Sequence, residues 1–363
     1  MKVLGISKRP AGLAVAEDSA VPAEHGGPGP VTGVSVVVPT LGRPSLRALL
    51  AALQDAPSTV EILVVDDRPD RAVALPVPPS VKVLTGRAAG PAAARNIGWR
   101  AARHEWVAFL DDDVLPSATW YADLLADLGP APRGVGGVQG RVRMPVPPGR
   151  PADRERATAG LAEGAWLTAD MAYRRAVLDA VGGFDERFPR AFREDSDLAL
   201  RVRLAGWRLE RGRRTVNHPV RRESIWVSVR TQRGNTDDAL LRRLYGPSWR
   251  TLLEVPHGRR RRHALVAAAG ALTAAALAGR YLTARRAPVA ARRLGRTAAV
   301  AGAAWALGTA EFAAARIAAG PGFPGEIGRT VVTSVVIPPV AVAHWLRGHI
   351  RWRAAGPWTG GAA

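Results

Sequence analysis

The sequence predicts an α/β domain built on a mostly parallel sheet, followed by an apolar helical region. Short runs rich in valine, isoleucine and leucine alternate with helical patterns over residues 32–225, which is typical of parallel sheets joined by helices. Two of these runs end in consecutive aspartates. From about residue 258 the chain becomes rich in alanine and arginine. We therefore expect a flexible tail (1–31), the α/β domain (32–225), a helical connector (226–257) and an apolar, arginine-rich helical region (258–363).

The elements of the α/β domain can be placed in order. The first strand, residues 34–38, stops at Pro39-Thr40, because proline cannot continue a strand ladder. Later strands are expected at residues 60–65, 81–84, 106–110 and 138–142, and helices at residues 46–53, 92–103 and 120–128 and from Glu194 onward.

Three consecutive carboxylates, Asp111, Asp112 and Asp113, follow the strand at 106–110. Like charges at one strand end repel each other, and burying them unpaired is costly. A bound divalent cation removes this cost, and Mg²⁺ and Mn²⁺ prefer carboxylate oxygens. Because ligands of open α/β sheets bind at the carboxyl ends of strands, the triplet predicts a metal site with positions left open for phosphate. A solvated acidic turn before the next helix is the alternative interpretation.

The formal charge of +20 narrows the class of partner. A strongly basic chain is typical of proteins that bind nucleic acid, membrane surfaces or anionic substrates. The arginines concentrate beside apolar runs rather than among stacking aromatics, so we expect no nucleic acid partner. The absence of cysteine excludes disulfides and thiolate chemistry. No long apolar run follows the N-terminal lysines, so no secretory signal is expected.

Several short motifs follow one another within residues 32–220. They are Val-Val-Val-Pro-Thr, Val-Val-Asp-Asp, Ala-Arg-Asn-Ile-Gly, Phe-Leu-Asp-Asp-Asp, Val-Gly-Gly-Phe-Asp-Glu and Glu-Asp-Ser-Asp-Leu. Their order and spacing resemble family 2 glycosyltransferases, which are inverting enzymes. The resemblance implies a GT-A fold, that is, a Rossmann-like nucleotide-diphospho-sugar transferase domain. It also implies a nucleotide-sugar donor and a divalent metal, Mn²⁺ or Mg²⁺.

The resemblance further implies roles for individual residues. The triplet is similar to the family's DxD motif, in which Asp113 would hold the metal on the diphosphate, and His218 would approach the same metal. Asp195 matches the catalytic base, with Glu194 beside it. The implied nucleotide-sugar-binding residues are Pro39, Thr40, Arg43, Asp67, Arg95, Asn96, Asp111 and Asp112.

The sequence departs from the family pattern at two places. Arg68-Pro69 follows the first aspartate pair where the family often has Gly-Ser, and Asp170 stands where the family often has asparagine. These departures leave the nucleobase and the sugar open. His218 has a second interpretation as a surface histidine beside Pro219.

The chemistry of glycosyl transfer agrees with this division of roles. Breaking a sugar–diphosphate bond leaves a nucleoside diphosphate with extra negative charge, which a cation at Asp113 would stabilise. The acceptor hydroxyl is a poor nucleophile at neutral pH, and a carboxylate at Asp195 would take its proton during attack. One base and no protein nucleophile predict a single displacement with inversion at the anomeric carbon.

The last third of the chain contains three apolar runs flanked by arginines. The first, residues 264–278, is shorter than the roughly 20 residues of a spanning helix and is interpreted as an interfacial helix or a marginal span. The second and third, 297–319 and 330–346, would either form a hairpin around residues 320–328, with both arginine-rich flanks on the cytoplasmic side, or attach to the membrane surface. A soluble alanine-rich subdomain is the alternative, favoured by Glu311, Arg316 and the Pro338-Pro339 pair.

We therefore expect an inverting glycosyltransferase at the cytoplasmic face of the cell membrane, acting in cell-envelope polysaccharide or glycolipid synthesis. Its expected partners are a nucleotide-sugar donor, a saccharide or lipid-linked acceptor, and anionic membrane lipids. One alternative is a nucleotidyltransferase of similar fold, which should carry a glycine- and lysine-containing phosphate loop where this chain has Leu41-Gly42-Arg43-Pro44. The other is a non-enzymatic, basic, membrane-tethered protein.

Overall fold

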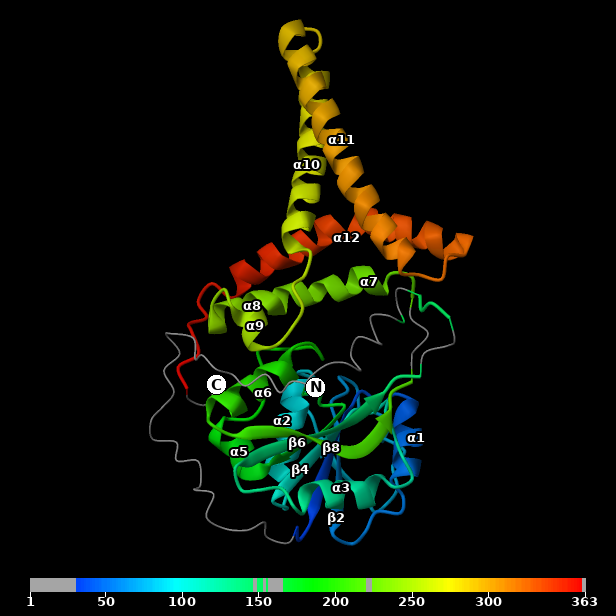
Figure 1. Cartoon of the computed structure of the whole chain (residues 1–363), viewed down its shortest axis with the longest axis vertical. Coiled ribbons are helices and arrows are strands. Elements are labelled where there is room, and N and C mark those ends of the chain that lie inside the picture. Colours follow the sequence, from blue (N-terminus) through cyan, green and yellow to red (C-terminus); the bar gives the residue numbers. More distant parts are fainter. Residues whose placement is uncertain (1–30, 146–148, 153–154, 156–165, 220–223, 361–363) are drawn as a thin grey trace. The chain divides into compact units, whose positions relative to one another are not determined.

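The computed structural model describes residues 31–145, 149–152, 155, 166–219 and 224–360 (Figure 1). Apart from its last residue, the tail expected at 1–31 lies outside this part. The described chain divides into two compact units. The sheet unit comprises residues 31–143, 166–219 and 356–360, and the helical unit comprises the described residues of 144–164 and 220–355.

In the part of the chain that the structure describes, the sheet unit contains one eight-stranded sheet with the order β3-β2-β1-β4-β7-β6-β8-β5. The strands are β1 (Val34–Thr40), β2 (Val60–Asp66), β3 (Lys82–Thr85), β4 (Trp106–Leu110), β5 (Leu115–Pro116), β6 (Val135–Arg143), β7 (Asp170–Arg174) and β8 (Arg208–Asn217). The strands β3, β2, β1 and β4 are parallel to their neighbours. Beyond β4 the sheet is mixed, because β7 is antiparallel to both β4 and β6. The expectation of a mostly parallel sheet is therefore confirmed for β3, β2, β1 and β4 and for the parallel pair β6–β8, but not for β7 and β5, which pair antiparallel.

The helices of the sheet unit connect these strands. They are α1 (Ser45–Ala52), α2 (Pro91–Ala101), α3 (Trp120–Leu128), α5 (Arg175–Ala180) and α6 (Glu194–Leu204). Parallel pairing brings the carboxyl ends of β1, β2 and β4 to one edge of the sheet. The antiparallel β7 begins at the same edge, where Asp170 pairs with Leu110. Segments that are distant in the sequence therefore meet at this edge.

Aromatic packing holds the end of β4 in place. Phe109 is fully buried and contacts Phe184 edge to face, with ring centroids 5.2 Å apart. Tyr173 of β7 also packs edge to face against Phe109, with ring centroids 6.5 Å apart. Full burial of a phenylalanine side chain stabilises a protein by about 1.5–3 kcal/mol. The backbone that leads into the aspartate triplet is thus anchored in the main core.

The helical unit is formed by α7 (Val227–Arg230), the 3-10 helix η1 (Thr231–Gly234), α8 (Asn235–Tyr245), α9 (Trp249–Leu252), α10 (Arg260–Thr283), α11 (Pro288–Ala318) and α12 (Pro324–Arg351). Among the described residues, α10, α11 and α12 are long and apolar enough to cross a membrane.

Within this unit, α10 and α11 lie side by side and antiparallel (Figure 1). The sequence predicts a pairing of the second and third apolar runs, whereas this hairpin joins the first and second. The helix α10 is longer than the first apolar run, because it also includes the flanking residues Arg260 and Arg280. Pro338 and Pro339 lie inside α12 and do not end it.

Candidate active site

Asp112 points into the sheet unit rather than into solvent. Its Oδ2 accepts a hydrogen bond from Thr40 Oγ1 at 2.7 Å, and its Oδ1 pairs with Arg43 Nη1 at 3.0 Å. Burial raises the pKa of Asp112 above its ordinary value, although Thr40 and Arg43 act in the opposite direction. The triplet is thus joined to the end of β1 and to the turn that follows it. The expectation that this strand stops at Pro39 is wrong, because β1 continues to Thr40 and the partly exposed Pro39 lies opposite Val65 of β2.

Arg95 connects the triplet to the start of α6. From α2, its Nη2 donates to Asp111 Oδ1 at 2.7 Å and its Nη1 donates to Glu194 Oε1 at 2.9 Å. The side chain is only 2% exposed. Burial by itself would lower the pKa of Arg95, but the two carboxylates raise it above its ordinary value. The guanidinium therefore remains charged and fixes two carboxylates at once.

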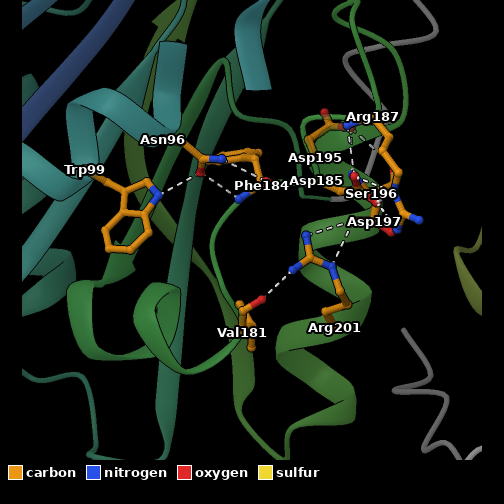
Figure 2. A network of polar contacts seen from close by, with 10 residues as sticks. All are labelled: Asn96, Trp99, Val181, Phe184, Asp185, Arg187, Asp195, Ser196, Asp197 and Arg201. Atoms are coloured by element: carbon orange, nitrogen blue, oxygen red, sulfur yellow. Dashed lines mark hydrogen bonds and ion pairs between the residues drawn. The ribbon is translucent and has the colours of Figure 1, made fainter. Parts of the chain in front are cut away.

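Glu194 and Asp195 open α6 but have different surroundings. Glu194 is 2% exposed, and burial together with the adjacent Asp195 raises its pKa to about 7. Asp195 is partly exposed, and its Oδ1 accepts a hydrogen bond from the Ser196 backbone N–H at 2.7 Å (Figure 2). Desolvation by its surroundings also raises the pKa of Asp195. Asp195 is therefore the more accessible of the two carboxylates.

The backbone in front of this pair is strained. Arg193 has a φ of 77°, in the left-handed region that residues with a side chain rarely adopt. Such conformations occur preferentially at functional sites, where the surrounding structure holds them. Here the strained residue immediately precedes Glu194 and Asp195 and sets the direction in which α6 begins.

Asp113 and His218 follow different strands, β4 and β8, and come together in the structure. The Asp113 Oδ2 and His218 Nε2 atoms are 3.5 Å apart, and the side chains are 12% and 13% exposed. A carboxylate with an imidazole is a donor pair that suits Mn²⁺, and two protein ligands leave positions for phosphate oxygens and water. Among the described residues, no group of three or more metal-ligating side chains is placed to hold an ion. The pair suits a metal ion whose remaining coordination positions are filled by a bound ligand.

The two aspartates at the end of β2 are both buried but have different hydrogen-bond partners. Asp66 is engaged by Arg68, whose Nε and Nη2 each donate to it at 2.8 Å. Asp67 Oδ2 accepts a hydrogen bond from the Gly90 backbone N–H at 2.9 Å. Asp67 Oδ1 is buried and has no hydrogen-bond partner among the described residues. A Cβ at Gly86 would lie 2.6 Å from this oxygen, so the chain passes very close to it. Asp67 therefore has an acceptor atom available for a ligand.

Asn96 is directed at a protein loop, not at the triplet. Its Oδ1 accepts from Trp99 Nε1 at 2.8 Å and from the Phe184 backbone N–H at 2.9 Å (Figure 2). Its Nδ2 donates to the Phe184 carbonyl and to Glu186 Oε1, both at 2.9 Å. Gly183 in this loop has a φ of 72°, and a Cβ there would lie 2.5 Å from Asn96 Oδ1. In this structure the amide of Asn96 holds the loop that leads to α6.

Two buried ion pairs support the site and do not follow from the motifs. Arg201 pairs with Asp197 at 2.8 Å on α6 and donates to the Val181 carbonyl at 2.7 Å (Figure 2). Beside the end of β4, where Asp170 lies opposite Leu110, Arg214 Nε donates to Asp170 Oδ1 at 2.7 Å, and both side chains are fully buried. The spacing of Asp197 and Arg201 along one helix face is a signal that could have revealed the first pair. The second pair joins β7 to β8 and has no local signal.

Residues 35–196 match the family model described as glycosyl transferase family 2. This part of the chain is a family 2 glycosyltransferase domain. It has the expected GT-A-like mixed sheet and is followed by the long apolar helices of the helical unit.

The glycosyltransferase domain also resembles curated proteins over part of their length. The pre-mycofactocin glycosyltransferase of Mycobacterium tuberculosis (strain H37Rv) is 32% identical over 206 residues, which cover 48% of this chain and 40% of that protein. The succinoglycan biosynthesis protein ExoO of Rhizobium meliloti (strain 1021) is 41% identical over 73 residues, which cover 19% of this chain and 21% of that protein. The chain thus spans less than half the length of each relative.

Solved structures show weaker likeness. Glucosyl-3-phosphoglycerate synthase from Mycobacterium tuberculosis, in complex with Mn²⁺ and UDP-glucose, is 17% identical with a TM-score of 0.42, covering 62% of this chain and 81% of that one. TarS 1–349 from S. aureus, in complex with UDP-GlcNAc, is 19% identical with a TM-score of 0.40, covering 61% and 70%.

Proposed function

We propose that the chain is an inverting glycosyltransferase that transfers a sugar from a nucleotide-diphosphate donor to a hydroxyl acceptor. The observation that carries this proposal is the buried Arg95, which joins Asp111 of the triplet to Glu194 at the start of α6. This bridge would fix the triplet, which serves the leaving group, relative to the start of α6, which serves the acceptor. Such preorganisation is what a displacement reaction requires of its enzyme.

The nucleobase would be recognised at the end of β2. The buried Oδ1 of Asp67 can only accept a hydrogen bond, so it needs a donor from the ligand. Uracil, thymine and guanine carry a ring N–H on their pairing edge, whereas adenine and cytosine do not. On adenine and cytosine the donor is an exocyclic amino group at the corner of this edge. We expect the buried oxygen to take the ring N–H of a UDP-, dTDP- or GDP-sugar donor.

The diphosphate would lie between the triplet and His218. Asp113 and His218 would hold a Mn²⁺ or Mg²⁺ ion, which when bound supplies positive charge against the departing nucleoside diphosphate. Arg43 is 43% exposed beyond its pairing with Asp112 and can present further N–H groups to the phosphates. The pairing of Thr40 and Arg43 with Asp112 makes this carboxylate a support for the diphosphate-binding turn.

Asp195 would act as the general base. It is partly exposed, whereas Glu194 is buried against Arg95. A raised pKa makes the Asp195 carboxylate a better proton acceptor than an ordinary aspartate. Asp195 takes the proton of the acceptor hydroxyl as that oxygen attacks the anomeric carbon, and the sugar–phosphate bond breaks on the opposite face. A single displacement of this kind inverts the anomeric configuration.

The acceptor would be a saccharide or a lipid-linked molecule of the cell envelope, and the reaction would take place at the cytoplasmic face of the cell membrane. Two features support this: the succinoglycan biosynthesis role in the name of one relative, and the three long apolar helices beside arginine clusters. Arginines at the ends of apolar helices suit anionic lipid headgroups.

The test is a comparison of Asp195→Asn with Asp179→Asn, an exposed carboxylate on α5. Membranes that contain the full chain are incubated with a panel of UDP-, dTDP- and GDP-sugars, and the release of nucleoside diphosphate is measured. Loss of a general base lowers the rate by about 10²–10⁴-fold. We therefore expect the rate of nucleoside diphosphate release to fall by about 10²-fold or more in Asp195→Asn and to stay at the wild-type level in Asp179→Asn. Full activity of Asp195→Asn would exclude Asp195 as the base.

A further inference from the structure

The hairpin of α10 and α11 exposes large apolar side chains on its outer surface. Leu265, Leu272 and Leu277 on α10 are 72%, 51% and 51% exposed, and Val300 and Leu307 on α11 are 73% and 72% exposed. Residues 264–279 and 297–310 contain no charged side chain. Soluble proteins rarely expose a continuous apolar surface of this kind, so it requires a partner.

On the inside of the hairpin, glycines of each helix face a large side chain of the other helix. A Cβ at Gly270 would lie 3.0 Å from Trp305, and one at Gly308 would lie 2.6 Å from Val266. Glycine at these positions lets the two backbones approach closely. Large apolar side chains exposed on the outside, together with glycines at the helix contacts inside, are unlike a helix pair in water and are typical of helices that pack within lipid.

Arginines border the apolar part of the hairpin at both ends. At the base, Arg259 and Arg262, at the start of α10, pair with Glu311 on α11. At the tip, the sequence carries Arg280, Arg285, Arg286, Arg292 and Arg293. The apolar residues 264–279 span roughly 24 Å at 1.5 Å per residue. This is a little shorter than the hydrocarbon core of about 30 Å, and long arginine side chains can bridge the difference to the headgroups.

The third apolar helix, α12, has different surroundings. It runs across the base of the hairpin (Figure 1) and packs along α8. Thr236 Oγ1 donates to the His344 carbonyl at 3.1 Å, and Trp352 Nε1 donates to the Thr236 carbonyl at 3.1 Å. Because α8 carries Asp237, Asp238 and two arginines, α12 cannot enter the hydrocarbon core without taking these charges with it.

The other face of α12 suits a membrane surface. Val331, Val332, Val335, Leu346 and Ile350 are exposed on this helix. A helix with one polar, protein-bound face and one apolar, exposed face is typical of the lipid–water interface.

We propose that the α10–α11 hairpin crosses the lipid bilayer as one unit, while α12 lies at the membrane surface. Two crossings place the sheet unit and residues 356–360 on one side of the membrane, and the arginine-rich turn around Ala284 on the other. This orientation opposes the positive-inside rule, under which arginine-rich short loops stay on the cytoplasmic side, so the test below determines both the crossings and their direction. The described residues after Ala355 belong to the sheet unit, which agrees with an even number of crossings. This inference refines the location given in the proposed function, and its test requires no catalytic activity.

The absence of cysteine in the chain permits a direct test with single-cysteine variants. The variants are Val73→Cys in the sheet unit, Thr359→Cys near the end, Leu272→Cys and Leu307→Cys in the hairpin, and Ala284→Cys at its tip. All five side chains are exposed, so no packing is lost. Inverted cell-membrane vesicles that contain the full chain are treated with a membrane-impermeant maleimide. Labelling rates are compared before and after the vesicles are opened or the membrane is dissolved.

We expect Val73→Cys and Thr359→Cys to react at similar rates, and Leu272→Cys and Leu307→Cys to react at least tenfold more slowly until the membrane is dissolved. Ala284→Cys should react only once the vesicles are opened. Labelling of the Leu272→Cys and Leu307→Cys variants as fast as Val73→Cys would overturn the proposal. The proposal would also be overturned if Val73→Cys and Thr359→Cys were labelled from opposite sides of the membrane, or if Ala284→Cys were labelled from the same side as Val73→Cys. A reversed pattern, with only Ala284→Cys labelled in closed vesicles, would support the two crossings and contradict the cytoplasmic location of the reaction.

Discussion

Arg95 Nη1 donates a hydrogen bond to Glu194 Oε1 at 2.9 Å, and both side chains are buried. The two residues are 99 positions apart in the sequence. The same guanidinium also binds Asp111, so one side chain holds two segments of the site in position. A buried arginine that bridges two carboxylates cannot be replaced by lysine without loss of hydrogen bonds. The lysine ammonium is a point charge that lacks the two separate, fixed N–H groups of the guanidinium.

Arg95→Lys therefore tests the bridge. We expect the variant to lose about 1–3 kcal/mol of unfolding free energy, because at least one buried carboxylate loses its partner. Transfer activity should fall by more than tenfold, since the triplet and α6 are no longer held together. Arg100→Lys, on the exposed face of the same helix, is the matched control and should change neither quantity. Chemical denaturation and the nucleoside diphosphate release assay measure the two effects, and an Arg95→Lys enzyme with the properties of wild type would show that the bridge is dispensable.

The protonation of Glu194 predicts how stability depends on pH. Its pKa is about 7 in the folded chain against an ordinary value of 4.5. Between these values the folded state keeps a proton that the unfolded state has lost, so the free energy of unfolding falls as the pH rises from about 4.5 to 7 and then levels off. The contribution is on the order of 3 kcal/mol at 1.36 kcal/mol per pKa unit.

Glu194→Gln should remove this dependence. We expect the unfolding temperature of the purified chain to decline less between pH 5 and 7 in the variant than in wild type. Asp179→Asn removes an exposed carboxylate from the same unit and should keep the wild-type slope. Equal slopes in wild type and Glu194→Gln would mean that Glu194 is already ionised throughout this range.

Asn96 gives a test that separates a structural role from a ligand-binding role. Asn96→Ala removes the hydrogen bonds to the backbone of Phe184 and leaves buried groups unpaired, which costs about 1–3 kcal/mol per group. Trp99→Phe removes the indole N–H that donates to the same amide but leaves the bonds from Asn96 to the Phe184 backbone. It should cost about 1 kcal/mol for the hydrogen bond, plus the burial lost with the larger ring. Thermal unfolding measures both. If Asn96→Ala keeps wild-type stability and loses only nucleotide affinity, the amide acts on the ligand and not on the loop.

The parts of the fold that have a local signal were predicted from the sequence. Residues 106–110 are a continuous apolar run, and the strand β4 has the same bounds. The aspartates after β2 and β4 meet at one edge because parallel strands end together, which follows from the alternation of strands and helices.

The parts that depend on distant pairings were not predicted. The sequence does not show that β7 inserts between β4 and β6 and reverses the sheet, because strand order depends on long-range packing. The sequence also does not show that Arg95 forms ion pairs with Asp111 and Glu194. In the helical unit, the close fit of Gly270 against Trp305 pairs α10 with α11, and an average hydropathy along the chain contains no information on such a fit.

The central claim is that a nucleotide diphosphate binds at the triplet with a metal held by Asp113. The most direct measurement is calorimetric titration of the full chain in detergent with UDP, dTDP and GDP, with and without Mn²⁺, on wild type, Asp113→Ala and the control Asp179→Ala. We predict that one of the nucleotides binds in the presence of Mn²⁺, that Asp113→Ala weakens this binding at least tenfold, and that Asp179→Ala does not. Nucleotide at 100 times its Kd should also stabilise wild type by about 2.7 kcal/mol. Failure of all three nucleotides to bind the folded chain, or equal Mn²⁺-dependent binding to wild type and Asp113→Ala, would contradict the claim.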